Sequence, residues 1–469
     1  MPEHPGGVAA PAGGDSPPKT RILALDHFFG QDLAALGSHP DLDVRRIPYQ
    51  RLRHPALRML GKEVGTGLVE FTSPRRAEAR ERYARWLLGE VRRLYLERSF
   101  DVFVLPSDSF FYVRDLPAAA HAIGVPVIVV QKETTISPDT MEDHSRVVGE
   151  FAPFVSDHMT VCSERHREFW LRTGAEDSRI VVTGQPRFDF YAALPPRREA
   201  RVGRVLFFSY FLDAYQPGVA GGQGLRTWEP LRRETEAALV KAAVAGAFRL
   251  VVKRHPQQPE DGEEELLREL AGDHFGQGVT IADPRADTRE LIGDADAVVG
   301  FQSTALYEAV AAGRRVVYAA WGSEFEEARA ALIPFDQAPP GCLAHARSAA
   351  ELLEFLDANS AAARPTCRQW VEAALGPIDG KATERTASEL LRVARAWPPG
   401  EARATLDRGR RWFSVAALVR STAAEATWTA ATLPALIAGQ QRRVNQRRQV
   451  AREQRGMAIE GLTSTSPNA

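Results

Sequence analysis

The sequence contains few cysteines and its net charge is close to zero. Among its 469 residues there are three cysteines, Cys162, Cys342 and Cys367. Their odd number and wide spacing make a disulfide framework or a zinc site improbable, so we expect a reducing, cytoplasmic compartment. The net charge of −1 carries no signature of a nucleic-acid partner.

Long apolar runs are missing as well. No run reaches the ~18 apolar residues that a membrane-spanning helix needs. The best candidate, 412–439, is interrupted by Arg420, Glu425 and Pro434. Residues 1–20 are rich in proline and glycine but lack the basic start and apolar centre of a signal peptide. We therefore expect a disordered leader over 1–20 and no membrane span.

What the sequence does contain is a regular alternation of short apolar strands and helices. Strands are expected at 21–25, 101–105, 125–130 and 248–253, and helices at 74–99 and 381–396, among others. Nearly all-apolar strands that alternate with helices predict parallel sheets covered on both faces. The pattern stops at a Pro- and Arg-rich linker near 194–204 and then restarts. We therefore predict an α/β protein with two doubly wound domains, 21–195 and 196–398.

The last stretch, 399–469, is expected to form a basic helical tail. A basic run covers 442–455, and Trp412 and Trp428 precede it. An amphipathic basic helix can lie on an anionic membrane surface. It can also pack back on the first domain and end in a solvated arm, and the sequence leaves both alternatives open.

One strand–turn–helix–strand unit, 297–317, is a candidate anion site. Gln302, Ser303 and Thr304 lie in its turn, where a helix begins. Free backbone N–H groups at a helix N-terminus, together with two hydroxyls, suit a phosphate. The alternative is that Ser303 and Thr304 only cap the helix.

A second cluster, Lys253, Arg254 and His255, ends the predicted strand 248–253. Two cations and an imidazole can bind a diphosphate or a phosphodiester. In a doubly wound sheet, this cluster and the 302–304 turn can face the same crevice. The alternative for His255 is a purely structural role at a strand end.

Polar residues also follow strands in the first half, where ligands of parallel sheets bind. Asp26 and His27 follow the strand at 21–25, and Glu133 follows the strand at 125–130. The alternative for each is a strand-end residue bonded to the next turn.

These segments together resemble a family. K-R-H-P at 253–256 with Q-S-T at 302–304 looks like motifs of bacterial transferases that use cytidine nucleotides: sialyltransferases, Kdo transferases and CDP-glycerol glycerophosphotransferases. V-T-G-Q-P-R-F-D at 182–189 is similar to a segment of those enzymes and of UDP-N-acetylglucosamine 2-epimerases. G-P-I-D-G-K-A-T-E-R at 376–385 resembles their late segment. S-T-A-L-Y-E-A-V-A-A-G-R-R-V-V at 303–317 is like the nucleotide-binding helix of GT-B glycosyltransferases.

The resemblance implies a GT-B fold, in which two Rossmann-like domains face each other across a cleft. A nucleotide-sugar donor would lie mostly on the second domain, with its phosphates on His255, Ser303 and Thr304. Lys253, Arg254 and Gln302 also belong to this predicted donor site.

Two further residues belong to the predicted donor site. Glu308 would bind the ribose hydroxyls, because a carboxylate can accept two hydrogen bonds from a diol. Arg187, near the domain junction, would reach the phosphates. The alternatives are a surface position for Glu308 and a hinge ion pair between Arg187 and Asp189.

Glycosyl transfer needs a base for the acceptor hydroxyl. Glu133 is the first candidate, because it occupies the place of the catalytic loop of the CDP-glycerol enzymes, which carry W-H-G-T where this chain has Q-K-E-T. Asp26 and His27 are the second, because an aspartate beside a histidine can tune a base. The sequence has no suitably placed Asp-x-Asp pair, so we expect no metal and no other cofactor.

We therefore predict a cytoplasmic, inverting, metal-independent GT-B glycosyltransferase. It would move a sugar from a nucleotide-activated donor to a glycan or lipid-linked acceptor of a cell-surface polysaccharide, with an anionic membrane surface as a partner of the tail. Two alternatives stay open. One is an epimerase-like enzyme, although the H-x-x-G-E loop of such epimerases is not found, and the other is a non-catalytic scaffold that binds a nucleotide-sugar or a polysaccharide.

Overall fold

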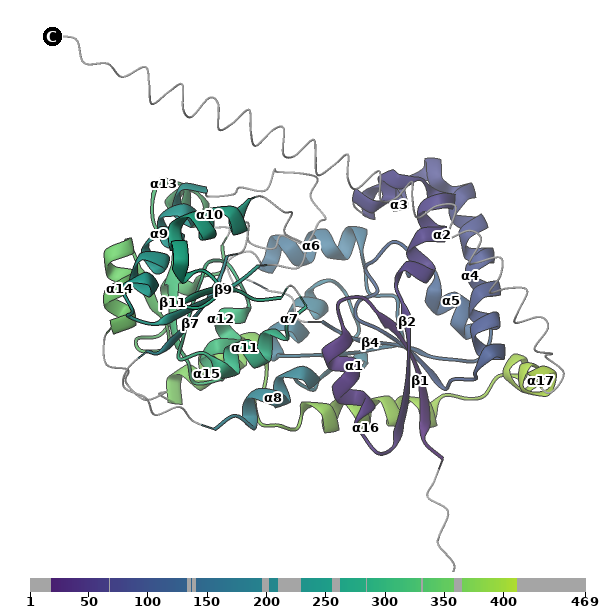
Figure 1. Ribbon diagram of the computed structural model, residues 1–469. Coiled ribbons are helices and arrows are strands. Elements are labelled where there is room, and N and C mark those ends of the chain that lie inside the picture. The colour runs from purple at the N-terminus through teal and green to yellow at the C-terminus, as the bar shows by residue number, and fades with distance from the viewer. Residues whose placement is uncertain are drawn as a thin grey trace, which may run out of the picture.

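The protein contains two six-stranded sheets in which all strand pairs are parallel (Figure 1). The computed structural model describes residues 18–66, 68–132, 136, 141–195, 202–209, 229–254, 262–283, 285–329, 332–357 and 365–410. Helices flank both sheets. The predicted α/β class with two Rossmann-like, doubly wound domains is therefore confirmed.

The first sheet has the strand order β2-β1-β3-β4-β5-β6. Its strands are β1 (Thr20–Asp26), β2 (Leu42–Pro48), β3 (Val102–Leu105), β4 (Val127–Val130), β5 (His158–Val161) and β6 (Ile180–Val182). The strand order reverses between β1 and β3, and ligands of doubly wound sheets bind at such a switch point, outside the carboxyl ends of the strands.

Helices cover this sheet because their apolar residues recur on one face. They are α1 (Gly30–Gly37), α2 (Gln50–Leu60), α3 (Leu68–Thr72), α4 (Ala77–Glu97), α5 (Leu116–His121), α6 (Met141–Phe151) and α7 (Glu164–Arg172). The longest, α4, buries Leu87, Val91 and Leu94 at helical spacing, while its first half carries exposed arginine–glutamate pairs. The sequence pattern predicted this helix and its buried face.

The second sheet has the order β12-β11-β10-β7-β8-β9. Its strands are β7 (Arg204–Phe208), β8 (Arg249–Lys253), β9 (Val279–Ile281), β10 (Ala297–Gly300), β11 (Arg315–Ala319) and β12 (Ala344–Ala346). Its helices are α9 (Glu229–Val244), α10 (Glu263–Ala271), α11 (Thr288–Asp294), α12 (Ala305–Ala311), α13 (Ser323–Ala328), α14 (Ala349–Asp357) and α15 (Pro365–Leu375). Read from β9, this is the 3-2-1-4-5-6 order of nucleotide-binding domains, with the switch point between β7 and β10.

The chain crosses between the domains twice. After β6 it forms α8 (Asp189–Ala192), where Phe188 and Tyr191 enter the core of the second domain. Later α16 (Ala382–Ala396) returns and packs on the first sheet through Leu390 and Val393, as Figure 1 shows. Although α16 lies within 196–398, it covers the sheet of the first domain.

Two of the motifs that suggested the family meet at this crossing. The Arg385 side chain donates from Nε to the Thr183 carbonyl at 2.7 Å. Asp189 accepts two backbone N–H groups at the start of α16, at 2.8 Å each. The segments 182–189 and 376–385 therefore fasten α16 to the first domain.

The described part of the tail also packs on the first domain. In α17 (Glu401–Arg410), Asp407 accepts the Tyr95 hydroxyl of α4 at 2.8 Å, and Arg403 pairs with Asp101. The rest of the tail, with Trp412, lies outside the described residues. Within the described part of the chain, no helix is long and apolar enough to cross a bilayer.

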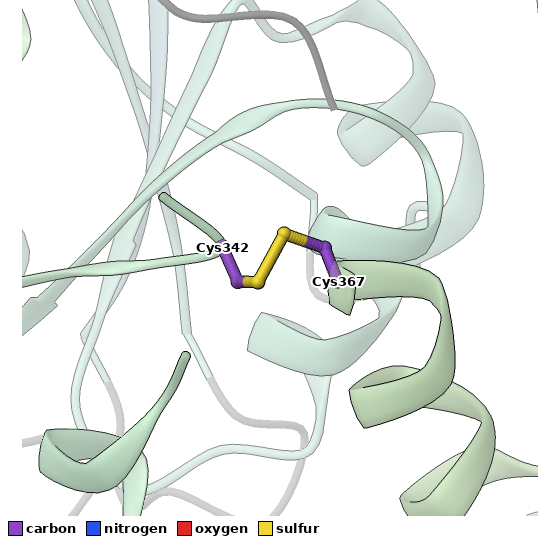
Figure 2. Close-up of a disulfide and its surroundings, with 2 residues drawn as sticks. All are labelled: Cys342 and Cys367. Carbon is purple, nitrogen blue, oxygen red and sulfur yellow. A yellow bond between two sulfur atoms is a disulfide. The ribbon is translucent and has the colours of Figure 1, made fainter. Parts of the chain in front are cut away.

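A disulfide joins Cys342 to Cys367, with an S–S distance of 2.13 Å (Figure 2). Both cysteines are buried, the first just before β12 and the second in α15. Cys162 is also buried but takes no part in a disulfide, and its Sγ lies 3.2 Å from His166 Nδ1. The expectation that a disulfide was improbable is therefore wrong. An odd count and wide spacing do not reveal which two cysteines the fold brings together, and the cysteines no longer support a reducing compartment.

Reduction of this disulfide is expected to lower the free energy of unfolding by about 3 kcal/mol, because the bond closes a loop with a sequence separation of 25 residues. Urea unfolding with and without a thiol reductant measures the effect. The double variant Cys342→Ser/Cys367→Ser serves as the control and should not respond to the reductant. Equal stability of the wild type under both conditions would contradict the prediction.

Candidate functional site

The carboxyl ends of both sheets border the junction between the domains. Gln31 lies in α1, directly after β1, and Asp287 lies between β9 and α11. The Gln31 side chain donates from Nε2 to Asp287 Oδ1 at 2.7 Å. The two sheet edges at which α/β proteins bind ligands are thus joined by a direct contact.

On the first domain, four rings gather at the switch point, and we call them the His27 cluster: His27, Tyr49, Phe110 and Tyr112. His27 follows β1, Tyr49 follows β2, and Phe110 and Tyr112 follow β3. The His27 ring stacks on Tyr49 with a centroid distance of 4.0 Å and lies 4.6 Å from Phe110. Its Nδ1 shares a hydrogen bond of 2.7 Å with the Tyr112 hydroxyl.

The surroundings of His27 keep its ring neutral. Burial, reinforced by the charges of Lys132 and Arg53, lowers the pKa of His27 to about 4. Burial also raises the pKa of Tyr112, so this residue stays a phenol. In the tautomer whose Nδ1–H donates to Tyr112, Nε2 carries a lone pair that can accept a proton.

The stability of the protein is expected to fall as the pH drops from about 6.5 to about 4. Because the pKa of His27 is lower in the folded chain than the usual 6.5, the unfolded chain binds the extra proton in this window. Burial lowers the pKa of His54, His144 and His158 as well. The contribution of His27 to this loss of stability is therefore measured by urea unfolding across this pH range, as the difference in the free energy of unfolding between the wild type and His27→Gln. Parallel pH profiles of the two proteins would contradict the prediction.

Of the other base candidates, Asp26 ends β1 and is half-buried. The Asp26 carboxylate and the Arg46 guanidinium both border Gly30, where an added Cβ would lie 3.8 Å from Asp26 Oδ2 and 3.7 Å from Arg46 Nη1. The sequence suggested that Asp26 tunes His27, but the group hydrogen-bonded to His27 is the Tyr112 phenol. Glu133 lies outside the described residues.

On the second domain, the positively charged side chains of the predicted donor site, Lys253 and Arg254, are bonded to residues of neighbouring elements. Lys253 is buried at the end of β8 and donates to the Asp283 carbonyl at 3.3 Å. Burial lowers the pKa of Lys253, and the charge of Asp283 partly offsets this. Arg254 forms an ion pair of 3.0 Å with Glu263 at the start of α10. His255 lies outside the described residues.

The turn at 302–304, predicted to bind an anion, has Gln302 and Ser303 buried, and their side chains form hydrogen bonds within the second domain. Gln302 donates from Nε2 to the Ile333 carbonyl at 3.3 Å and accepts the Ile333 N–H at 2.7 Å. Ser303 Oγ accepts the backbone N–H of Ala305 at 3.2 Å, and Thr304 is the N-cap residue of α12. The Ser303 contact fits the capping alternative, whereas the Thr304 side chain makes no capping hydrogen bond in α12. A role in phosphate binding stays a prediction for both.

The switch point of the second sheet offers a different polar group. Ser209 directly follows β7, and its hydroxyl is buried with no hydrogen-bond partner in the described part of the chain. A buried hydroxyl that lacks a partner costs free energy unless a ligand or a water satisfies it. Ser209 therefore joins the candidates for ligand contact.

Arg187 and Glu308 form a buried ion pair across the junction, with 3.2 Å between Nη2 and Oε1. The Tyr191 hydroxyl donates to the other Glu308 oxygen at 2.5 Å. The surface position considered for Glu308 is therefore wrong. The carboxylate of Asp189, which the sequence offered as a partner of Arg187, caps α16.

The backbone around Arg187 extends this network into both domains. Its N–H donates to Asp32 of α1 at 3.1 Å, and its carbonyl accepts from Arg289 of α11 at 3.3 Å. Arg289 also pairs with Asp287 at 2.7 Å. Burial works against the charge of Asp287, but the bonds from Arg289 lower the pKa of this carboxyl overall. The junction is thus held by charged, hydrogen-bonded groups.

Sequence reasoning missed the aromatic part of the site. Tyr49, Phe110 and Tyr112 lie one to seven residues beyond β2 and β3. The signal that could have found them is the occurrence of large rings, including the F-F-Y run at 110–112, in loops at the carboxyl ends of strands.

The fold and site define a two-domain α/β protein in which the carboxyl ends of both sheets border one junction. No protein-family model and no curated protein sequence matches the chain. The solved structure of UDP-GlcNAc 2-epimerase from Methanocaldococcus jannaschii is 14% identical, with a TM-score of 0.46, over 80% of this chain and 99% of that one. A solved structure of a variant of the wall teichoic acid polymerase TagF is 11% identical, with a TM-score of 0.45, and the match covers 81% of this chain and 89% of that one. Similarity at this level assigns the chain to neither family.

Proposed function

We propose that the protein is a transferase that moves a glycosyl group from a nucleotide-activated donor to a hydroxyl of a glycan or lipid-linked acceptor. The observation that carries the proposal is that loops at the carboxyl ends of both sheets meet at one junction, with the neutral His27–Tyr112 pair at the switch point of the first sheet. The acceptor binds beside the His27 cluster, and the donor binds at the switch point of the second sheet.

The proposed reaction uses His27 as the base. The acceptor oxygen forms a bond to the anomeric carbon of the donor, and its proton passes to Nε2 of His27. The bond between that carbon and the donor phosphate oxygen breaks, and its electron pair leaves with the nucleotide. Attack from the side opposite the leaving group inverts the anomeric centre. Glu133 is the alternative base.

Donor contacts come from the second domain. Lys253 ends β8, Ser209 follows β7, and Ser303 and Thr304 follow β10. His255, two residues after Lys253 in the sequence, stays a predicted contact. A lysine or a hydroxyl placed there can hold the phosphate charge that develops as the nucleotide leaves. The mechanism calls for no metal ion.

Nucleotide release from CMP-, CDP-, UDP- and GDP-linked sugars tests the proposal, with donor binding followed in parallel by thermal shift. Release that requires an added glycan acceptor supports the transferase. Epimerisation of a UDP-linked sugar in the absence of an acceptor would replace the transferase with the epimerase-like alternative. Binding without turnover would favour the scaffold, and failure to bind any donor would refute the proposal.

A further inference from the structure

Phe28 combines two unfavourable features at the first switch point. Its backbone has a φ of +54°, and among the described residues it is the one non-glycine position with a positive φ. Its side chain is 51% exposed. A bulky residue in this region of φ is strained, and strain of this kind concentrates at functional sites. Folding alone gives no reason to keep an aromatic ring here.

The exposed ring extends the His27 cluster outward. Phe28 lies 5.0 Å from the His27 ring and 6.1 Å from the Tyr49 ring, between centroids. The surface beside the proposed base is therefore partly apolar. A ligand that places a hydroxyl at His27 must also present an apolar face to Phe28, and a sugar ring carries both.

Positive charges border the same surface. The Lys132 ammonium lies 5.7 Å from the centroid of the Phe28 ring. Arg53 lies one turn of α2 beyond Tyr49, and its backbone N–H donates to the Tyr49 carbonyl at 2.9 Å; burial lowers the pKa of His27 and raises the pKa of Tyr112, and the charge of Arg53 lowers both. Asp26 contributes a carboxylate and Arg46 a guanidinium, both beside Gly30. Lys132 and Arg53 bring two positive charges to the neighbourhood of the rings and suit a ligand with a negative charge.

We infer that Phe28, Lys132 and Arg53 form an acceptor subsite for an anionic saccharide. The face of a sugar ring packs on Phe28, and a carboxylate or phosphate group on that sugar pairs with Lys132 and Arg53. The inference rests on the proposed function, because it names the acceptor class of the same site. A neutral glycan would leave both cations without a counter-charge from the ligand.

Direct binding of saccharides to the full-length protein tests the subsite in the absence of donor. One oligosaccharide is compared in neutral, carboxylated and phosphorylated forms by calorimetry. We expect at least one charged form to bind ten-fold or more tightly than the neutral form, and the comparison of the two charged forms identifies the anion. Phe28→Ala and Lys132→Ala should each weaken that binding about ten-fold.

Two further variants sharpen the test. Leu270→Ala is the matched control, because Leu270 is 41% exposed and lies on α10 of the second domain; its binding should equal that of the wild type. Phe28→Gly removes the ring and suits the positive φ, so it folds and should still lose the binding. Equal affinity for neutral and charged forms, or unchanged affinity in Phe28→Gly, would overturn the inference.

The nucleotide-release assay separates this inference from the proposed function. Release that depends equally on neutral and anionic acceptors overturns the subsite and keeps the transferase. Anionic saccharide binding that is lost in Phe28→Gly, in a protein that binds no donor, supports the subsite and refutes the transferase.

Discussion

Replacing His27 by glutamine is expected to lower turnover about 10²–10⁴-fold, the usual contribution of a general base. Glutamine occupies similar space and keeps hydrogen-bonding capacity near Tyr112, but it cannot take the acceptor proton. Donor affinity should change little, because His27 lies on the first domain and the proposed donor contacts lie on the second. Steady-state nucleotide release together with donor titration separates the two effects.

A pair of tyrosine variants controls for this change. Tyr112→Phe removes the hydroxyl that holds the imidazole, so turnover should fall about ten-fold, within the range of a misplaced catalytic group. Tyr95→Phe removes a hydroxyl that is bonded to Asp407 at the tail, so turnover should be unchanged. Near-normal turnover of His27→Gln would exclude His27 as the base and leave Glu133 and Asp26 as candidates.

Replacing Arg187 by methionine is expected to lower the free energy of unfolding by about 3–5 kcal/mol, because it leaves the buried Glu308 carboxylate without its positively charged partner. The two side chains lie 3.2 Å apart and are almost fully buried. Adding Glu308→Gln to Arg187→Met should restore part of the loss, since the amide carries no charge and still accepts from Tyr191. The midpoint of urea unfolding measures both variants.

An ion pair on the surface serves as the control for the buried pair of Arg187 and Glu308. Arg82 and Glu78 form a surface pair one turn apart on α4, and Arg82→Met should cost only about 0.3–0.5 kcal/mol. If Arg187→Met costs no more than Arg82→Met, the junction pair contributes little and the junction is held by other contacts.

Several strands were predictable because they are short apolar runs followed by polar residues, whereas β12 (Ala344–Ala346) was not predicted. The run at 101–105 became β3 (Val102–Leu105), and the run at 248–253 became β8 (Arg249–Lys253). The helix expected at 381–396 is α16 (Ala382–Ala396), but its place on the first sheet was not foreseen. An amphipathic pattern tells which face of a helix is buried, not which surface buries it.

The site was predictable only in part, for a similar reason. His27 was singled out by its position after a strand, but its partner Tyr112 is 85 residues away in sequence. Arg187 and Glu308 are separated by 121 residues. Local patterns locate the edges of sheets, whereas pairs between distant residues, including Cys342 with Cys367, depend on how the elements pack.

The return of α16 makes the first domain discontinuous in sequence. Its sheet buries Ile22, Val104 and Ile128 against Leu390 and Val393. During synthesis on the ribosome, the first sheet would emerge with this apolar face covered only in part, by α1, and α16 would follow only after about two hundred further residues had been added. A nascent chain in that state is a substrate for chaperones. A fragment cut at the linker near 195 would leave the part of this face that α16 covers exposed and is expected to aggregate, whereas co-expression of a peptide that contains α16 should keep it in solution.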